Sequence, residues 1–333
     1  MTIAVPVDFA DEALTAEIAE DLAVVEAALR DTTFGGNEMF MEVSRHGMAA
    51  GGKRFRAMLV LLAARFGDPR DKRIVPGAVA IELTHLATLF HDDVMDEASM
   101  RRGQPSANSL YGNSVAILAG DYLFARASRI LADLGPEAVR IQAETFSRLV
   151  DGQLAETVGV RPDGDALAHY MKVIEDKTGS LIATSGRFGA MFAGASSSLV
   201  EQIAEACMRI GVAWQLSDDV IDLASSSQES GKSEGTDLKQ GVRTLPVLYA
   251  LRSSAPSPDE ARLRDLLSLD ELSDPALHAE ALALLRKSPA MAEARATVRT
   301  WIGEARAIVT GLPDVPARAA FESLCDFVET RTG

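Results

Sequence analysis

Apolar residues recur at spacings of three and four positions along nearly the whole chain, which is the period of an amphipathic α-helix. Between residues 8 and 30, for example, Leu14, Ile18, Leu22 and Val25 fall on one face. No alternating strand pattern and no Asn-Gly hairpin signal competes with this periodicity. Aromatic residues make up only 5% of the chain, whereas unbranched helix formers abound. The sequence therefore predicts an all-α fold.

Gly, Pro and Asp residues divide this pattern into separate helices. The predicted helices span residues 8–30, 55–66, 75–96, 114–134, 137–158, 165–176, 178–193, 198–224, 244–252, 258–270, 275–287, 289–310 and 314–331. Segments 98–108 and 224–241 lack the pattern and are expected to be mobile. Because no repeat and no low-complexity linker separates the helices, a single domain over residues 1–333 is expected.

The net charge of −15 excludes non-specific nucleic-acid binding, which requires a basic face. The two cysteines, Cys207 and Cys325, provide neither a disulfide framework nor the spacing of a zinc site. No apolar run approaches the about 20 residues that span a membrane. The N-terminal segment also lacks the basic and apolar regions of a signal peptide. A soluble, cytoplasmic protein is expected.

A cluster of acids ends one of the two most apolar helices, in the segment HDDVMDEASMRRG. Asp92, Asp93 and Asp96 have the spacing i, i+1, i+4, so their carboxylates can share one helical face. At a helix C-terminus they repel both the helix dipole and one another. Magnesium, a hard ion that prefers oxygen ligands, would offset this repulsion. The alternative is a solvated acidic helix end without function.

The same spacing recurs in WQLSDDVIDL, where Asp218, Asp219 and Asp222 interrupt a second apolar helix. Gln215 lies one turn before Asp218 and Asp219 on this helix. An identical spacing on two apolar helices is far less expected by chance than either copy alone. Two such clusters are suited to holding several metal ions on one substrate diphosphate.

Basic residues stand near both clusters. Gly51-Gly52-Lys53-Arg54-Phe55-Arg56 is a glycine turn into a helix, and free N–H groups at helix N-termini bind anions. Its alternative is an ordinary solvated basic turn. The remaining candidates are His85 on the helix of the first cluster, Arg101 and Arg102 after it, Lys177 and Thr178 at an expected helix break, and Lys232, Asp237 and Lys239 in a possible lid.

Together these motifs resemble the trans-isoprenyl (polyprenyl) diphosphate synthase family, long-chain type. The resemblance rests on KRFR at 53–56, HDDVMD with RRG at 91–103, KT at 177–178, QLSDDVID at 215–222 and GKSEGTDLKQG at 231–241, in family order. It implies a single bundle of antiparallel helices around a central substrate cavity, in a homodimer. It also implies condensation of isopentenyl diphosphate with an allylic diphosphate.

The resemblance also assigns roles to residues. It places the diphosphate of isopentenyl diphosphate on Lys53, Arg56, His85 and Arg102. It places about three Mg²⁺ ions on Asp92, Asp96 and Asp218, supported by Asp93, Asp219 and Asp222. It places the allylic diphosphate on Arg101, Lys177, Thr178, Gln215, Lys232 and Lys239. One position departs from the family pattern: Val242 stands where the family often has Lys, and Arg243 follows it.

Product length is expected to depend on Ala87, Thr88 and Thr84, which precede Asp92 on the same helix. Family members that make short products often carry an aromatic residue at the position of Ala87. A small residue there, and no insertion between Asp93 and Asp96, favour a product longer than C20. The alternative is that Ala87 serves only close helix packing, in a synthase of C15–C20 products.

Two other functions share parts of this pattern. A terpene cyclase would share the fold and the first acidic motif, but it binds one diphosphate and has no need of Lys53, Arg56 and a second motif. A non-catalytic subunit of a heteromeric synthase generally lacks the aspartate motifs, which are intact here. The synthase is the reading that uses both the acidic and the basic motifs.

Overall fold

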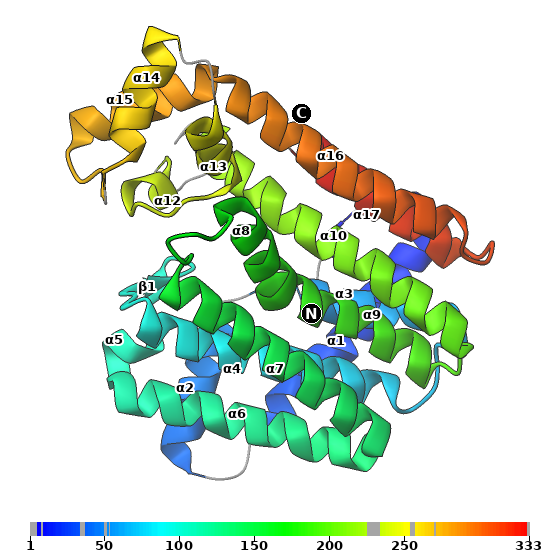
Figure 1. The fold of residues 1–333 in the computed structure, drawn as a ribbon. Helices are drawn as coiled ribbons and strands as arrows, with labels where there is room; N and C mark the ends of the chain where they lie inside the picture. Colours follow the sequence, from blue (N-terminus) through cyan, green and yellow to red (C-terminus); the bar gives the residue numbers. More distant parts are fainter. Residues whose placement is uncertain are drawn as a thin grey trace. The chain divides into compact units, whose positions relative to one another are not determined.

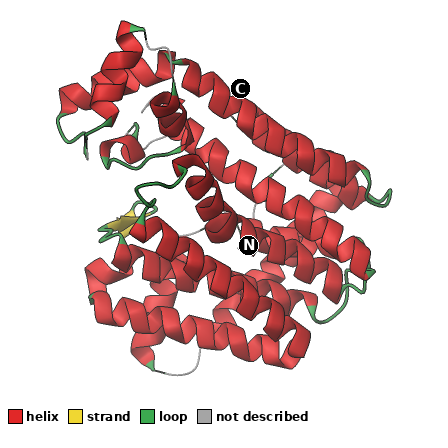
Figure 2. Ribbon diagram, viewed as in Figure 1, coloured by secondary structure: helices red, strands yellow, loops and turns green. Residues whose placement is uncertain are grey.

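The computed structural model describes residues 5–7, 9–33, 37–49, 52, 54–224, 234–253, 257–269 and 271–331. Nearly all regular structure in this part of the chain is helical (Figure 2), which confirms the predicted all-α class. The chain forms two compact units. Unit 1 comprises Met1–Ser147, Leu181–Cys207 and Ile308–Ser323, and unit 2 comprises Arg148–Ser180, Met208–Ala307 and Leu324–Gly333. That residues 1–333 act as a single domain stays a prediction.

Unit 1 contains most of the N-terminal half of the chain (Figure 1). Its elements are α1 (Glu12–Thr33), α2 (Glu38–Ala49), α3 (Phe55–Ala64), α4 (Ile74–Met95), β1 (Met100–Arg101), β2 (Gln104–Pro105), α5 (Ala107–Tyr111), α6 (Asn113–Leu134), the first half of α7 (Pro136–Val158), nearly all of α9 (Ser180–Phe192), the first part of α10 (Ser197–Ala224), the end of α16 (Pro289–Thr310) and the first half of α17 (Pro316–Thr330). The strands β1 and β2 form a small antiparallel hairpin.

Helix α4 is the central helix of unit 1, where it packs against α1, α3 and α6. At Gly120 of α6, an added Cβ would lie 2.3 Å from Nε2 of His91, so the glycine allows this close approach. Among the described residues, α4 is also the one helix long and apolar enough to cross a membrane, and 61% of its most apolar window is buried. Such burial is expected of a central helix in a bundle.

Unit 2 contains the second half of α7 and most of the C-terminal half of the chain. Its other elements are α8 (Ala166–Ile174), the π-helical turn η1 (Glu175–Gly179), the remainder of α10, α12 (Thr236–Lys239), α13 (Leu245–Arg252), α14 (Pro258–Leu267), α15 (Pro275–Lys287), most of α16 (Pro289–Thr310) and the end of α17 (Pro316–Thr330). Side-chain caps explain where several of these helices begin. Asp165 accepts from the N–H of Leu167 at 2.9 Å, and Ser257 forms a capping box with Glu260.

The structure corrects the predicted elements at four places. Helix α2, at 38–49, was absent from the predicted set. Segment 224–241, predicted to be mobile, contains α12, and its residues 225–233 lie outside the described part of the chain. Segment 98–108, predicted to be mobile, instead forms the β1–β2 hairpin and the start of α5. The expected helix break at Lys177-Thr178 is a π-helical turn, through which the chain passes from α8 into α9.

Candidate active site

The three acids of the first cluster have different surroundings in unit 1. The carboxylate of Asp93 is buried and pairs with Arg101, whose Nε and Nη2 lie 2.7 and 2.5 Å from Oδ1. Asp92 is half-buried in the last turn of α4, and Asp96 is the exposed C-cap residue. Asp93 is therefore held by the hairpin, whereas Asp92 and Asp96, one turn apart, are the more accessible carboxylates.

A second group in unit 1 is basic. Arg56, His85 and Arg102 interact with one another electrostatically, and burial together with Arg56 and Arg102 holds the pKa of His85 well below its ordinary value. Burial lowers the pKa of Arg56 to about 10, with a further contribution from Arg102. The Nε atom of Arg56 is buried and has no hydrogen-bond partner among the described residues. A group of two guanidinium side chains and an imidazole is suited to binding a polyvalent anion.

Glu82 of α4 is the buried carboxylate of this basic group. Its Oε1 accepts from the backbone N–H of Ala57 at 3.0 Å, which satisfies one of the free donors at the start of α3. Its Oε2 lies 3.5 Å from Nη1 of Arg54, a residue in the left-handed conformation (φ 49°) that also pairs with Glu26. Glu82 thus fixes the turn that leads into α3 and Arg56.

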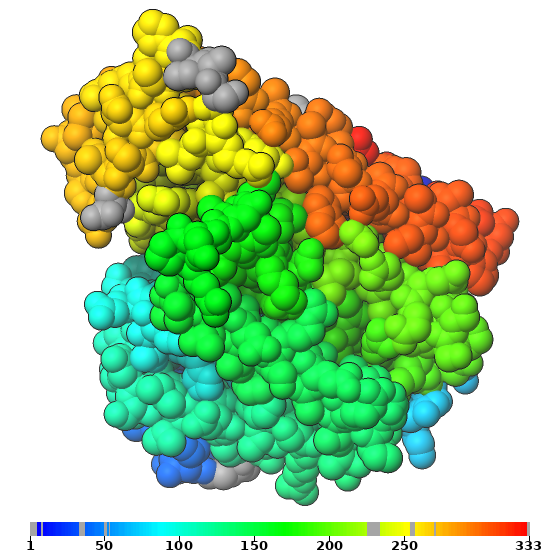
Figure 3. All heavy atoms as spheres, in the orientation of Figure 1, coloured from blue at the N-terminus to red at the C-terminus, as the bar shows by residue number. Residues whose placement is uncertain are grey.

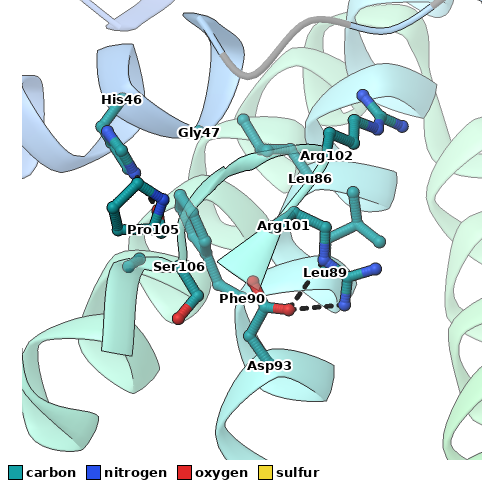
Figure 4. Close-up of a pocket in the computed structure, with 11 residues that line it drawn as sticks. His46, Gly47, Leu86, Leu89, Phe90, Asp93, Arg101, Arg102, Pro105 and Ser106 are labelled. Carbon is teal, nitrogen blue, oxygen red and sulfur yellow. Dashed lines mark hydrogen bonds and ion pairs between the residues drawn. The ribbon is translucent and has the colours of Figure 1, made fainter. Parts of the chain in front are cut away.

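Figure 4 shows a pocket beside this group. Leu86, Leu89 and Phe90 of α4 form its apolar wall, and Asp93 and Arg101 meet at its lower edge. The remaining lining residues are His46, Gly47, Arg102, Pro105, Ser106 and Ala107. The α2 helix and the hairpin are joined here by a hydrogen bond of 2.7 Å between Nε2 of His46 and the carbonyl oxygen of Pro105.

The second acidic cluster lies in unit 2, where Asp219 is its most buried member. The hydroxyl of Tyr170 and the amide of Gln215 both donate to Asp219, the amide at 3.1 Å. Burial raises the pKa of Asp219 to about 7, although both hydrogen bonds oppose this shift. Tyr170 was not among the predicted site residues. Nothing in the sequence connects it with Asp219, 49 positions away.

The other two acids of the second cluster are more accessible. Asp218 pairs with Arg331, whose guanidinium also lies 4.3 Å from the ring centre of Trp214. Asp222 accepts from the backbone N–H of Asp237 at 3.4 Å, which ties α10 to the first residues of α12. Arg331, near the end of the chain, is a second residue that the sequence did not connect with the cluster.

The π-helical turn brings two further predicted residues near the second cluster. Thr178 donates to the side-chain oxygen of Gln215 at 3.4 Å, and Lys177 pairs with Glu156 of α7. Lys239 is exposed at the end of α12, and Val242 and Arg243 are also exposed. The predicted residues Lys53 and Lys232 lie outside the described part of the chain.

Of the residues proposed to control product length, Thr84 and Ala87 are buried in unit 1, and Thr88 is half-buried. Thr84 is fully buried and accepts from the amide of Gln142 at 2.7 Å. Ala87 is 1% exposed, and Thr88 donates to the carbonyl oxygen of His85 at 2.8 Å. Their role in product length stays a prediction.

Comparison with known proteins identifies the family. The model of the polyprenyl synthetase family matches residues 37–285. A nonaprenyl diphosphate synthase from Mycobacterium tuberculosis is 48% identical over 333 residues, which cover 100% of this chain and 98% of that protein.

Two solved structures agree with this result. The geranylgeranyl pyrophosphate synthase from Corynebacterium glutamicum, complexed with calcium and isoprenyl diphosphate, has a TM-score of 0.89 and 42% identity, covering 98% of this chain and 100% of that one. A decaprenyl diphosphate synthase from Rhodobacter capsulatus has a TM-score of 0.86 and 32% identity, covering 97% and 99%. This chain belongs to the polyprenyl synthetase family.

Proposed function

We propose that the protein is a trans-polyprenyl diphosphate synthase that condenses isopentenyl diphosphate with an allylic diphosphate and makes products longer than C20. The observation that carries this proposal is the basic group of unit 1. Arg56, His85 and Arg102 lie close together, and the buried Nε of Arg56 has no hydrogen-bond partner among the described residues. A diphosphate would supply both the missing negative charge and the missing acceptors. We assign this group to isopentenyl diphosphate.

The allylic diphosphate is assigned to the basic and polar residues of unit 2. Lys177 is a cation on the π-helical turn, and Thr178 and Gln215 are joined by a hydrogen bond. A terpene cyclase would bind one diphosphate and would leave the basic group of unit 1 unused. A non-catalytic subunit would have no need of two intact aspartate motifs.

Divalent cations, magnesium in particular, are assigned to Asp92, Asp96 and Asp218. Within the described residues, no three or more His, Cys, Asp or Glu side chains are already gathered for a metal ion. Magnesium fits such a donor set, because it is usually held by one or two carboxylates, substrate phosphates and water. The related synthase from Corynebacterium glutamicum was crystallised with calcium and isoprenyl diphosphate, which supports a divalent ion. Family resemblance suggests about three ions.

In the proposed reaction, the bond between the allylic carbon and the diphosphate oxygen breaks, and the electron pair leaves with the diphosphate. Bound divalent cations would neutralise the charge that develops on this leaving group. Lys177 would bind the same oxygens, and Arg56 and Arg102 would hold the second substrate in a fixed orientation. The double bond of isopentenyl diphosphate then forms a carbon–carbon bond to the allylic carbon. Loss of a proton to the released diphosphate yields an allylic product longer by one isoprene unit.

A product longer than C20 is supported by the nonaprenyl and decaprenyl synthases among the relatives and by the small side chain of Ala87. The alternative, a product of C15–C20, is represented among the similar structures by the geranylgeranyl pyrophosphate synthase.

We further propose that the protein is a cytoplasmic homodimer. Large apolar side chains are exposed on α5, α6 and the first half of α7. Parts of these helices form the surface seen in Figure 3. Leu110, Ile117, Leu118 and Val139 are each between 42% and 52% exposed. A second copy of the chain would cover such a surface. Both cysteines are buried free thiols, which suits a reducing compartment. Sedimentation equilibrium would measure the oligomeric state.

The deciding experiment incubates the purified protein with magnesium, isopentenyl diphosphate and farnesyl diphosphate, and then separates the dephosphorylated products by chromatography. A ladder that extends beyond C20 is expected. Cyclic hydrocarbons would support a cyclase, and no product from any allylic primer would support a non-catalytic subunit. A ladder that stops at C20 would keep the reaction and overturn the proposed length.

A further inference from the structure

The π-helical turn η1 is held by an ion pair to a buried carboxylate that the proposed function does not use. A π-helical turn contains one more residue than an α-helical turn, is rare, and is frequently found at functional sites. In η1 the hydroxyl of Ser180 donates to the carbonyl oxygen of Asp176 at 2.5 Å. Asp176 itself is 4% exposed, next to Lys177.

Both carboxylate oxygens of Asp176 are paired with cations. Nε of Arg148 lies 2.8 Å from Oδ1, and Nζ of Lys172 lies 2.8 Å from Oδ2. Arg148 also reaches the backbone of the turn, with Nη2 3.5 Å from the carbonyl oxygen of Glu175. Removing Arg148 would leave the buried carboxylate with Lys172, whose side chain is largely exposed, as the other cation of this cluster. The guanidinium of Arg148 therefore contacts both a side chain and a backbone carbonyl of the turn, those of Asp176 and Glu175.

Three residues of α7, spaced one helical turn apart, lie against η1. Arg148 pairs with Asp176, and Glu156 pairs with Lys177. Between them, a Cβ added at Gly152 would lie 2.9 Å from the backbone nitrogen of Lys177. One face of α7, formed by Arg148, Gly152 and Glu156, thus contacts Asp176 and Lys177 of the turn.

Helix α10 holds the opposite side of the turn. A Cβ added at Gly179 would lie 2.5 Å from the sulfur of Met208. On this side Thr178 donates to Gln215, which in turn donates to Asp219 of the second cluster. A rotation of η1 would consequently move both Lys177 and the hydrogen bonds that lead to the second cluster.

We propose that Asp176, through its ion pair with Arg148, is a positioning residue that sets the orientation of Lys177 and Thr178 for the allylic diphosphate. The inference rests on the proposed function, because it takes Lys177 and Thr178 as contacts of that substrate. Neither Asp176 nor Arg148 is assigned to bind substrate. They act through the backbone of the turn.

The test compares Asp176→Asn, Arg148→Gln and Arg148→Lys with the parent. Lys172→Ala is the matched control, because its ammonium contacts the same carboxylate, its side chain is 64% exposed, and among the described residues this side chain makes no contact with the backbone of η1. Michaelis constants are measured for each substrate in turn. Binding of a non-hydrolysable allylic thiolodiphosphate is measured by calorimetry, and thermal melts accompany both.

Asp176→Asn and Arg148→Gln are expected to weaken binding of the allylic compound about tenfold, the effect of one misplaced charged contact. The Michaelis constant for isopentenyl diphosphate should stay within about twofold of the parent value. Arg148→Lys, which keeps the charge, should recover much of the loss, and Lys172→Ala should change neither substrate.

Equal weakening for both substrates, or a lower melting temperature with unchanged allylic binding, would overturn the proposal and leave the pair a purely structural contact. If Asp176→Asn fails to fold, the half-exposed Arg148 still provides the comparison through its two variants. If the parent binds the analogue but makes no product, the proposed function fails while the calorimetric comparison still decides the role of Asp176.

Discussion

The guanidinium of Arg102 occupies the space that a side chain at position 52 would need. A Cβ added at Gly52 would lie 2.7 Å from Nη1 of Arg102. The glycine of the basic turn therefore serves the close approach of a cation from the hairpin, a contact between residues 50 positions apart. Because Arg102 is exposed and its side chain is long, it can move aside when this space is filled.

Gly52→Ala is expected to displace Arg102 without unfolding the protein. The Michaelis constant for isopentenyl diphosphate should rise about tenfold, since one charged contact is misplaced. The constant for the allylic substrate should hardly change. Steady-state kinetics with each substrate varied in turn will measure both. Gly303→Ala is the control, because a Cβ there meets no atom within 4 Å. An unchanged constant for isopentenyl diphosphate would show that Arg102 binds nothing there.

His85 is expected to make the stability of the free protein depend on pH. Burial and the guanidinium groups of Arg56, Arg102, Arg54 and Arg101 lower its pKa in the folded state. The unfolded chain then binds more protons below about pH 6.5, so the folded state loses stability as the pH falls. One such group contributes up to about 1.4 kcal/mol per pH unit.

Urea unfolding at pH 7.5 and 5.5 will test this effect of His85. His85→Gln should lose less stability between the two pH values than the parent, whereas the control His169→Gln should behave like the parent. Inorganic diphosphate should reduce the pH dependence of the parent, because a bound anion raises the pKa of His85. Equal pH dependence in the parent and His85→Gln would contradict the prediction.

Activity is expected to require divalent metal bound by both aspartate clusters. Asp92→Ala and Asp218→Ala should each lower turnover by about 100-fold or more, and excess chelator should abolish it. Neither substitution should cost more than about 1 kcal/mol of stability, because Asp218 loses only a partly exposed ion pair with Arg331. Asp133→Ala, at an exposed position of α6, is the control. Full turnover in excess chelator would refute the metal assignment.

Ala87→Phe is expected to shorten the product toward C15–C20 while the first condensations continue. Ala87 is 1% exposed, so the larger ring must displace its neighbours and should cost about 1–3 kcal/mol of stability in the free enzyme. Chromatography of dephosphorylated products and thermal melts will be compared with those of Ala132→Phe, at an exposed site on α6. An unchanged product ladder in a folded variant would place the growing chain elsewhere.

The sequence predicts the helices well because a helix of a large bundle must bury one face, and burial imposes the period of 3.6 residues. Helix α2 escaped this reasoning because it buries only three residues, Val43, Ser44 and Met48. The β1–β2 hairpin escaped because two-residue strands are too short to show alternation, and because Arg102, a non-glycine residue with φ 52°, occupies its turn.

Some residues of the candidate site could likewise be predicted from the sequence, and others could not. The spacing of Asp92 and Asp96 could be read from the sequence, because residues four apart on a helix share a face. The partners that hold the site could not. Glu82 beneath the basic group and Tyr170 beside Asp219 are joined to it by contacts across 25 and 49 positions. Such contacts depend on tertiary packing, for which local periodicity carries no signal.

The ion pair between Lys177 and Glu156 changes what an affinity for the allylic substrate measures. Lys177 already has an anionic partner, so binding at this residue exchanges one carboxylate for one diphosphate. The measured free energy is then a difference between two ion pairs, both of which are weakened by added salt. Affinity should respond to ionic strength less steeply than the charge of the ligand suggests. Weakly charged anions should bind poorly at Lys177, because their attraction to it is too small to displace the carboxylate of Glu156.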